Sequence, residues 1–246
     1  MPITIEIVGK TDTGKKRSAK VNEDSFFAAK INDICLAVVC DGMGGAKGGN
    51  IASSLAVDSF VETVTELLSG PSNYRDILFV AVAKANDKVF MSAKEDKSLT
   101  GMGTTMVACI FDGEEYYAVN IGDSRMYVIN DKNYSITQIT KDHSLVQELI
   151  DSGALTKEQA EKSPNKNIIT RVLGVDAAIE GDFYRGKYES GIFLLCSDGL
   201  YNYVAESDII SYISQYDNIE HCADELILKA NKNGGGDNIT AVIIKP

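Results

Sequence analysis

Apolar and polar residues alternate along several short stretches of the chain, a pattern typical of β-strands that bury one face. Near the start, Ile3, Ile5 and Ile7 alternate with polar residues, whereas residues 34–40 form one continuous apolar run. Asp112-Gly113 is a strong signal for a hairpin turn between two such stretches. We expect strands around Ile3 to Ile7 and near residues 25–29, 34–40, 104–111, 115–121, 125–129, 134–139, 179–188, 192–196 and 239–244.

Longer stretches carry apolar residues at every third or fourth position, which predicts helices with one buried face. Two of them, 50–68 and 74–94, follow one another, and two more, 206–213 and 219–230, precede the last strand. Because the strands come in antiparallel runs and the helices in pairs, the pattern favours an α+β fold over a doubly wound parallel sheet. Two sheets packed face to face with helix pairs outside would use every element.

The stretch between these groups has a different character. Residues 144–153 and 156–162 predict two short helices around Gly153, and the polar residues 163–167 follow them. Exposed, weakly packed segments move more than a core does. We therefore expect this stretch to be mobile.

Composition and charge narrow the function. The chain has 246 residues, 44% hydrophobic and 24% charged, enough to bury a core as one domain, with two small domains as an alternative. Its formal net charge of −11, without an evident basic patch, disfavours nucleic-acid and membrane partners. Because no stretch has the apolar length of a membrane helix and no export signal is apparent, we expect a cytoplasmic protein.

The widely spaced cysteines are expected to be buried thiols: Cys35, Cys40, Cys109, Cys196 and Cys222.

Acidic residues gather beside glycine or asparagine at the ends of the apolar strands, where their carboxylates can project into one cleft. The clusters are Asn22-Glu23-Asp24, Asp41-Gly42-Met43-Gly44-Gly45, Gly122-Asp123-Ser124-Arg125, Ser197-Asp198-Gly199 and Gly236-Asp237-Asn238. Taken singly, each Asp-Gly pair is more often a simple turn. Carboxylates held together repel one another, which raises their pKa values unless a cation neutralises them. Because hard oxygen ligands select Mg²⁺ or Mn²⁺, the set predicts a metal centre.

The order of these clusters resembles that of the type 2C, metal-dependent family of serine/threonine protein phosphatases in its compact bacterial form. Further matching motifs are Thr11-Asp12-Thr13-Gly14, Gly101-Met102-Gly103-Thr104-Thr105, Thr140-Lys141-Asp142-His143-Ser144 and Ile169-Thr170-Arg171-Val172-Leu173-Gly174. The resemblance spans nearly the whole chain. It implies one catalytic domain over 1–246, built as a four-layer α/β/β/α sandwich of two antiparallel sheets flanked by helix pairs. It also places the family's variable flap at about 144–167.

Carried over position by position, the resemblance implies that Glu23, Asp41, Asp198 and Asp237 hold two metal ions, directly or through water, and that the Gly42 carbonyl completes the shell. Asp41 and Asp198 would then be catalytic, because two such ions activate a bridging water and clamp the phosphoryl oxygens.

A third, weaker ion is implied at Asp123, together with Asp198. The alternative for Asp123 is a turn aspartate that pairs with Arg125.

The phosphate-binding arginine of the family has two candidates here. Arg17 lies two positions farther from the Asn-Glu-Asp motif than usual, and Lys20 lies closer. We expect Arg17 to bind the phosphate, because a guanidinium can make two parallel hydrogen bonds, with Lys20 as the alternative. Met43 stands where animal members have a histidine proposed as the general acid, so metal-bound water or another acid must protonate the leaving oxygen. His143 is expected to be structural.

The resulting hypothesis is a Mn²⁺- or Mg²⁺-dependent phosphatase that hydrolyses phosphoserine and phosphothreonine monoesters in proteins, opposing a serine/threonine kinase. We expect it to act as a monomer. A catalytically inactive, phosphoprotein-binding relative is disfavoured by the intact acidic positions, and a metal-dependent phosphodiesterase is disfavoured by the acidic balance. The glycine-rich residues 42–47 match neither the dinucleotide-binding nor the P-loop template.

Overall fold

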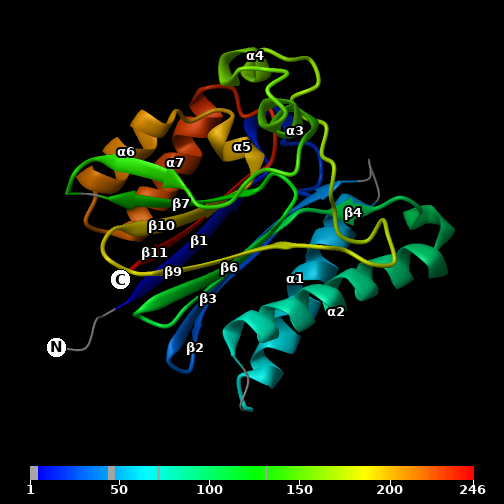
Figure 1. The fold of residues 1–246 in the computed structure, drawn as a ribbon. Helices are drawn as coiled ribbons and strands as arrows, with labels where there is room; N and C mark the ends of the chain where they lie inside the picture. The colour runs from blue at the N-terminus through cyan, green and yellow to red at the C-terminus, as the bar shows by residue number, and fades with distance from the viewer. Residues whose placement is uncertain (1–4, 44–47, 71–72, 131) are drawn as a thin grey trace.

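Two antiparallel β-sheets lie face to face in the computed structural model, which describes residues 5–43, 48–70, 73–130 and 132–246 (Figure 1). The first sheet has the order β1-β11-β10-β7-β8, formed by β1 (Glu6–Asp12), β11 (Ile239–Lys245), β10 (Ile192–Cys196), β7 (Arg125–Asn130) and β8 (Ser135–Gln138). The second has the order β2-β3-β5-β6-β9, formed by β2 (Asp24–Ile31), β3 (Ile34–Met43), β5 (Met106–Phe111), β6 (Glu115–Ile121) and β9 (Asp182–Lys187). The short β4 (Gly103–Thr104) pairs with the end of β3.

Helices cover the outer face of each sheet. The second sheet carries α1 (Gly49–Leu67) and α2 (Tyr74–Glu95), and the first carries α5 (Asp198–Tyr201), α6 (Glu206–Gln215) and α7 (Ile219–Lys232). Single-turn 3-10 helices lie at η1 (Lys15–Arg17) and η2 (Lys97–Leu99). The expected α+β class and the α/β/β/α sandwich are confirmed. No helix in the described parts of the chain is both long and apolar enough to cross a membrane.

Strand β3 shows how the sequence produces these layers. Leu36 and Val38 point to the core under α1 and α2, whereas Ala37 and Val39 point to the core between the sheets. Side chains alternate between the two faces of a strand, so a strand covered on both sides needs apolar residues at every position. This is why residues 34–40 are continuously apolar. All five cysteines are buried free thiols, as expected.

Aromatic rings fill part of the space between the sheets. The Phe193 ring of β10 lies 5.4 Å from both Phe111 and Tyr116 of the opposite sheet, measured between ring centroids. Such pairs stabilise a core by more than their buried area alone. They hold the two sheets in a fixed relation, which matters because residues at the ends of both sheets form the site described below.

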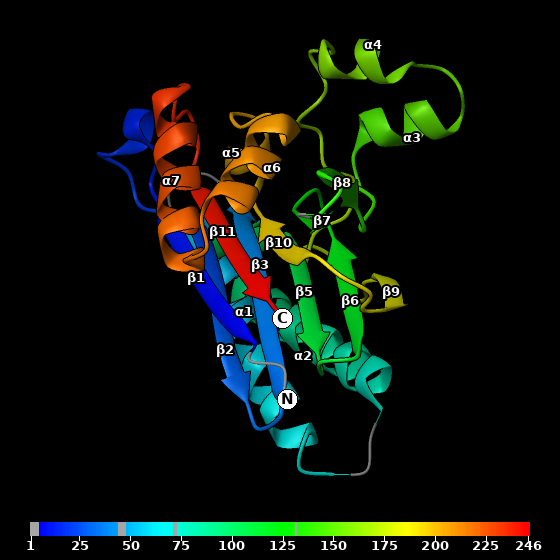
Figure 2. The same cartoon turned by 90° about the vertical axis from the view of Figure 1, so that its left-hand side faces the viewer.

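Helices α3 (Leu145–Asp151) and α4 (Lys157–Glu161) project together from one end of the sandwich (Figure 2). The Ser144 side chain caps α3 by accepting a hydrogen bond from the backbone N–H of Gln147. Thr156 and Gln159 form a reciprocal capping box at the start of α4. These are the two short helices expected on either side of Gly153.

Some boundaries differ from the expectation. β1 continues through polar residues to Asp12, because it pairs with β11 at a sheet edge where a strand need not be apolar; Ile3 lies outside the described residues. The strand expected at 104–111 is divided, since Thr105 donates its backbone N–H to the Asp41 carbonyl at 2.9 Å. β9 begins at Asp182 rather than at residue 179. The four-residue helix α5 was not expected, because it is too short to show a period.

Candidate active site

The acidic clusters meet at one end of the sandwich. Antiparallel pairing sets Asp24, at the start of β2, opposite Asp41 near the end of β3. In the other sheet, Asp198 directly follows β10 at the start of α5, and Asp237 precedes β11, the partner of β10. Asp123 follows β6. The charges of the other four aspartates all act on the Asp41 carboxyl, so the structure brings the predicted residues of both sheets together.

Asp24 ties the two sheets to each other at this end. It is 6% exposed, and its Oδ2 accepts hydrogen bonds from Ser197 Oγ at 2.7 Å and Thr240 Oγ1 at 2.6 Å, both from the first sheet. Thr240 in turn donates its backbone N–H to Ser197 Oγ at 3.0 Å. A buried carboxylate is tolerated only where such partners exist. Asp24 therefore fixes how the ends of the two sheets are joined.

Glu23 and the Gly42 carbonyl share a narrow space. Gly42 donates its N–H to the Glu23 carbonyl at 3.0 Å. A Cβ atom added to Gly49 would lie 2.5 Å from Glu23 Oε1 and 2.8 Å from the Gly42 carbonyl oxygen, so only glycine fits at the start of α1. Two of the oxygens that the family resemblance implies as ligands thus lie against the same α-carbon.

Arg17 reaches this site from η1. Its Nη1 pairs with Asp237 Oδ1 and lies 3.5 Å from Asn238 Oδ1 and 3.9 Å from Glu23 Oε2. Lys20 is exposed, and its side chain makes no hydrogen bond or ion pair with the described residues. Of the two predicted phosphate-binding residues, Arg17 is therefore the one placed among the carboxylates.

Asp123 lies in a loop held by His143. Gly122, with φ of +100°, donates its N–H to His143 Nδ1 at 3.1 Å, and the His143 backbone N–H returns a 2.9 Å bond to the Gly122 carbonyl. His143 is buried and directly precedes the residue that caps α3, a position that fits the structural role expected for it. Arg125 pairs with Asp142 at 2.7 Å and not with Asp123, so the alternative of a turn aspartate paired with Arg125 is wrong.

A cavity of about 440 Å³ connects this end of the sandwich with α3 and α4. Asp123 and Asp198 line one wall, and Gln147, Lys157 and Lys166 line the other. The predicted flap residues therefore lie beside two of the predicted site residues.

Comparison with known proteins decides the family. The model of the family described as Protein phosphatase 2C matches residues 12–231. The chain belongs to the protein phosphatase 2C family. The resemblance inferred from the motifs is confirmed.

Individual relatives match almost the whole chain. The serine/threonine phosphatase stp of Listeria monocytogenes is 37% identical over 241 residues, which cover 96% of this chain and 94% of the relative. Protein phosphatase PhpP of Streptococcus pneumoniae is 37% identical over 250 residues, covering 98% and 97%. Among solved structures, the phosphatase Stp1 of Staphylococcus aureus has a TM-score of 0.90 at 33% identity, covering 99% and 96%. The catalytic domain of PstP in complex with two manganese ions has a TM-score of 0.84 at 32% identity, covering 98% and 97%.

Burial and mutual repulsion raise the pKa values of the phosphatase's clustered carboxyls. Burial raises the pKa of Asp41 well above its usual range, and the acidic neighbours add to the effect. Burial, followed by the charge of Asp237, raises the pKa of Asp198 to about 6. Burial, followed by the charge of Asp198, raises the pKa of Asp123 to about 7. A cation bound among these groups would remove much of this electrostatic cost.

Unsatisfied oxygens show that the donor set fits a divalent ion. Asp24 Oδ1 and Asp198 Oδ1 are buried and accept no hydrogen bond from any described residue. Such orphaned carboxylate oxygens are rare unless a ligand takes them. Among the described residues, no three Asp, Glu, His or Cys side chains are already arranged as the shell of one ion. The carboxylates repel one another, and Arg17 takes one oxygen of Asp237.

Two buried residues were missed as parts of the site. The sequence motifs indicated Glu23 as a metal ligand but gave no role to its neighbour Asp24. Asp24 nevertheless lies at one end of a strand, as the other acidic residues of the site do. Asn238, 2% exposed, accepts the Glu23 N–H at 2.8 Å and donates to the Thr13 carbonyl at 2.8 Å. The sequence signal that could have identified Asn238 is its position directly after Asp237, a predicted metal ligand.

We expect the metal-free phosphatase to lose stability as the pH rises. The pKa of Asp24 is raised to about 7, first by burial, so this carboxyl holds its proton more tightly in the folded protein than in the unfolded chain. The resulting contribution to stability is fully present below about pH 4 and is lost by about pH 7. In chelator, thermal unfolding should show a Tm at least about 3 °C lower at about pH 7.5 than at about pH 5.5. Asp24→Asn should shrink this difference, and an equal or higher wild-type Tm at the higher pH would contradict the pKa shifts.

Proposed function

We propose that this chain is a divalent-metal-dependent phosphatase that removes phosphate from phosphoserine and phosphothreonine in proteins. The observation that carries the proposal is the meeting of carboxylates from both sheets at one end, with raised pKa values that nearby cations would lower. Relatives named serine/threonine phosphatases, 36–37% identical over nearly the whole chain, support the substrate class. The intact acidic positions speak against an inactive relative.

Two ions, Mn²⁺ or Mg²⁺, are the cofactors that suit these ligands. Glu23 and Asp41 from the second sheet, Asp198 and Asp237 from the first, and the Gly42 carbonyl offer only oxygen donors. The related PstP catalytic domain contains two manganese ions, which supports the number and one of the two metals. When bound, such ions activate water as a nucleophile and offset the charge on the phosphoryl oxygens.

Asp41 and Asp198 are the catalytic residues of this proposal, because each lies among the other carboxyls and is positioned by its own sheet. Neither Met43 nor His143 supplies the proton for the leaving oxygen. Met43 has no acidic group, and both ring nitrogens of the buried His143 are engaged: Nδ1 accepts the Gly122 N–H, and Nε2 lies 3.2 Å from Asp182 Oδ2. Water in the cleft, or another acid, protonates the leaving group.

Arg17 is the residue we assign to the substrate phosphate. Its contacts with Asp237 and Glu23 keep the guanidinium at the acidic end of the sandwich. Once cations neutralise those carboxylates, the guanidinium is free to hold a phosphate with two parallel hydrogen bonds. Lys20 remains the weaker alternative, because its side chain points to no described partner.

The remaining features of the proposal concern the setting of the enzyme. Residues 1–246 form a single catalytic domain in which 144–167 act as a mobile flap over the cavity and influence which phosphoproteins bind. The substrates are products of a serine/threonine kinase. The enzyme is a cytoplasmic monomer without nucleic-acid or membrane partners.

We expect activity on an aryl phosphate to require Mn²⁺ or Mg²⁺ and to disappear in chelator. Asp198→Asn should lower kcat/KM by about a hundredfold or more and weaken Mn²⁺ binding measured by calorimetry, because it replaces a charged carboxylate ligand with a neutral amide. Asp87→Asn, an exposed change on α2, is the matched control and should leave both unchanged. Full activity of the wild type without divalent metal would rule out the proposed function.

A third, weaker ion at Asp123 is a separate part of the proposal. Asp123→Asn keeps the shape of the side chain and removes a charge that only such an ion requires. The variant should keep two tightly bound Mn²⁺ ions and have a Tm in chelator no lower than that of the wild type, but lose turnover that higher Mn²⁺ partly restores. Wild-type turnover at every Mn²⁺ concentration would eliminate the third ion.

A further inference from the structure

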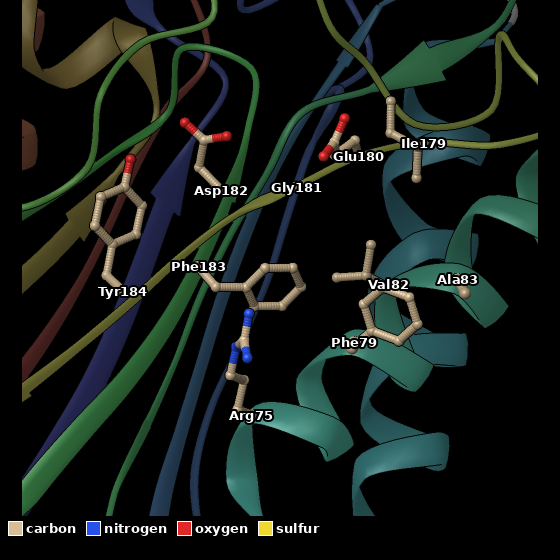
Figure 3. Close-up of a pocket in the computed structure, with 10 residues that line it drawn as sticks. All are labelled: Arg75, Phe79, Val82, Ala83, Ile179, Glu180, Gly181, Asp182, Phe183 and Tyr184. Carbon is tan, nitrogen blue, oxygen red and sulfur yellow. The ribbon is translucent and has the colours of Figure 1, made fainter.

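A groove of about 520 Å³ lies between α2 and β9 (Figure 3), and the residues that line it include none of the proposed metal ligands. Apolar side chains form part of its walls: Phe79 and Val82 come from α2, and Ile179 and Phe183 come from the β9 side. Phe79 is 61% exposed, among the most exposed large hydrophobic side chains in the described residues. An exposed aromatic side chain in a concave apolar site is typical of a binding surface.

Opposite charges stand at the two ends of this groove. Figure 3 shows Arg75 at one end and Glu180 at the other, with Phe183 and Phe79 between them. Both charged residues are exposed, and neither charged group makes a hydrogen bond or ion pair with the described residues. A ligand with a basic group at one end and an acidic group at the other would therefore be bound in one direction.

The backbone of β9 offers a second set of contacts, because β9 is the edge strand of its sheet. Tyr188 donates its N–H to the Glu114 carbonyl. In an antiparallel pair every second residue forms hydrogen bonds with the partner strand, so the backbone groups of residues 182, 184 and 186 bond to β6. The N–H and C=O groups of Phe183, Arg185 and Lys187 point away from β6, and no described strand pairs with them. An extended peptide can add to such an edge.

The Glu180 end of the groove leads towards the site. Asp182, at the start of β9, lies 3.2 Å from His143 Nε2, and His143 Nδ1 accepts the N–H of Gly122, the neighbour of Asp123. Only two side-chain contacts thus separate this end of the groove from the loop that carries a predicted metal ligand. A chain bound along β9 can continue directly towards the acidic end of the sandwich.

We propose that the groove binds an extended segment of the phosphoprotein substrate, antiparallel to β9, at a distance from the phosphorylated residue. An apolar side chain of the segment packs over the paired rings of Phe79 and Phe183, whose centroids lie 6.1 Å apart. A basic residue near its C-terminal end meets Glu180, and an acidic residue near its N-terminal end meets Arg75. The antiparallel direction continues the pattern of the sheet. This inference rests on the proposed function. The groove would help the enzyme to select among phosphoprotein substrates.

The test compares three synthetic peptides. The first is a phosphothreonine octapeptide alone. The second consists of the tail Glu-Thr-Val-Thr-Val-Thr-Lys, then a Gly-Ser linker, then the octapeptide. The linker has about fifteen residues and spans roughly 20 Å. The third has Glu in place of the Lys of the tail. The linker follows the basic end because that end lies nearest the site.

With wild-type enzyme and Mn²⁺, we expect the second peptide to have a kcat/KM at least about fivefold above that of the octapeptide, through a lower KM at unchanged kcat. Phe79→Ser and Glu180→Lys should remove this advantage. The third peptide should regain it on Glu180→Lys, because the charges are again opposite. Leu228→Ser, at a residue 59% exposed on α7, is the matched control and should behave as wild type.

All of these variants should hydrolyse an aryl phosphate at the wild-type rate, which shows that they are folded. As an independent measurement, the second peptide should slow hydrogen exchange at the amides of Phe183, Arg185 and Lys187 in wild-type enzyme.

Three outcomes would overturn the groove proposal: no advantage of the tailed peptide with wild type, an advantage that survives Phe79→Ser, or a wild-type dimer that Phe79→Ser dissociates in sedimentation. The last result would make a second copy of this chain the occupant. Failure of the wild type to hydrolyse the octapeptide in Mn²⁺ would instead refute the proposed function.

Discussion

Carboxylates from two packed sheets repel one another where the strands end together, and the structure depends on how this repulsion is balanced. Burial makes the repulsion stronger, because the site excludes the water that would screen it. Arg17 balances part of it at Asp237, and the hydroxyls of Ser197 and Thr240 balance part of it at Asp24. The buried oxygens that remain unsatisfied explain why a divalent cation suits this place.

The scaffold has to keep these groups together against that repulsion. Three apolar layers do so: one under each helix group and one between the sheets, where rings such as Phe193 pack against the opposite sheet. Backbone register then fixes each carboxylate, as in the pairing of Asp24 with Asp41. At the edge of the core, the hydrogen bond between Asp24 and Thr240 also joins the two sheets. Stability and chemistry therefore place opposite demands on the same end of the molecule.

Local patterns predicted those parts of the structure that depend on local interactions. The continuous apolar run of β3 and the caps at Ser144 and Thr156 could be inferred from neighbouring residues, and so could the acidic clusters at strand ends. The roles of Asp24 and Asn238 could not, because each is defined by partners more than 170 residues away in the chain. The groove beside β9 was hidden for the same reason. Residues 179–181 were predicted as strand, whereas they line a space whose other wall is α2.

The motif order carried more information about the site than any single motif did. Each Asp-Gly pair could have been a turn, as Asp112-Gly113 is: Asp112 Oδ1 accepts the N–H groups of Glu114 and Glu115. In the sequence, Arg17 was preferred over Lys20 only for the chemistry of its guanidinium, because their distances from the Asn-Glu-Asp motif differ by only three positions. The contacts of Arg17 with Asp237 and Glu23 support Arg17 as the candidate.

The central claim is that the clustered carboxyls hold protons which divalent cations replace. Calorimetric titration of metal-free enzyme with Mn²⁺ at about pH 6, in two buffers of different ionisation enthalpy, measures the protons released on binding. Carboxyls with pKa values of about 6 and 7 should release on the order of one proton or more per enzyme, and the release should be smaller at about pH 8. Binding of Mn²⁺ without proton release at about pH 6 would contradict the claim.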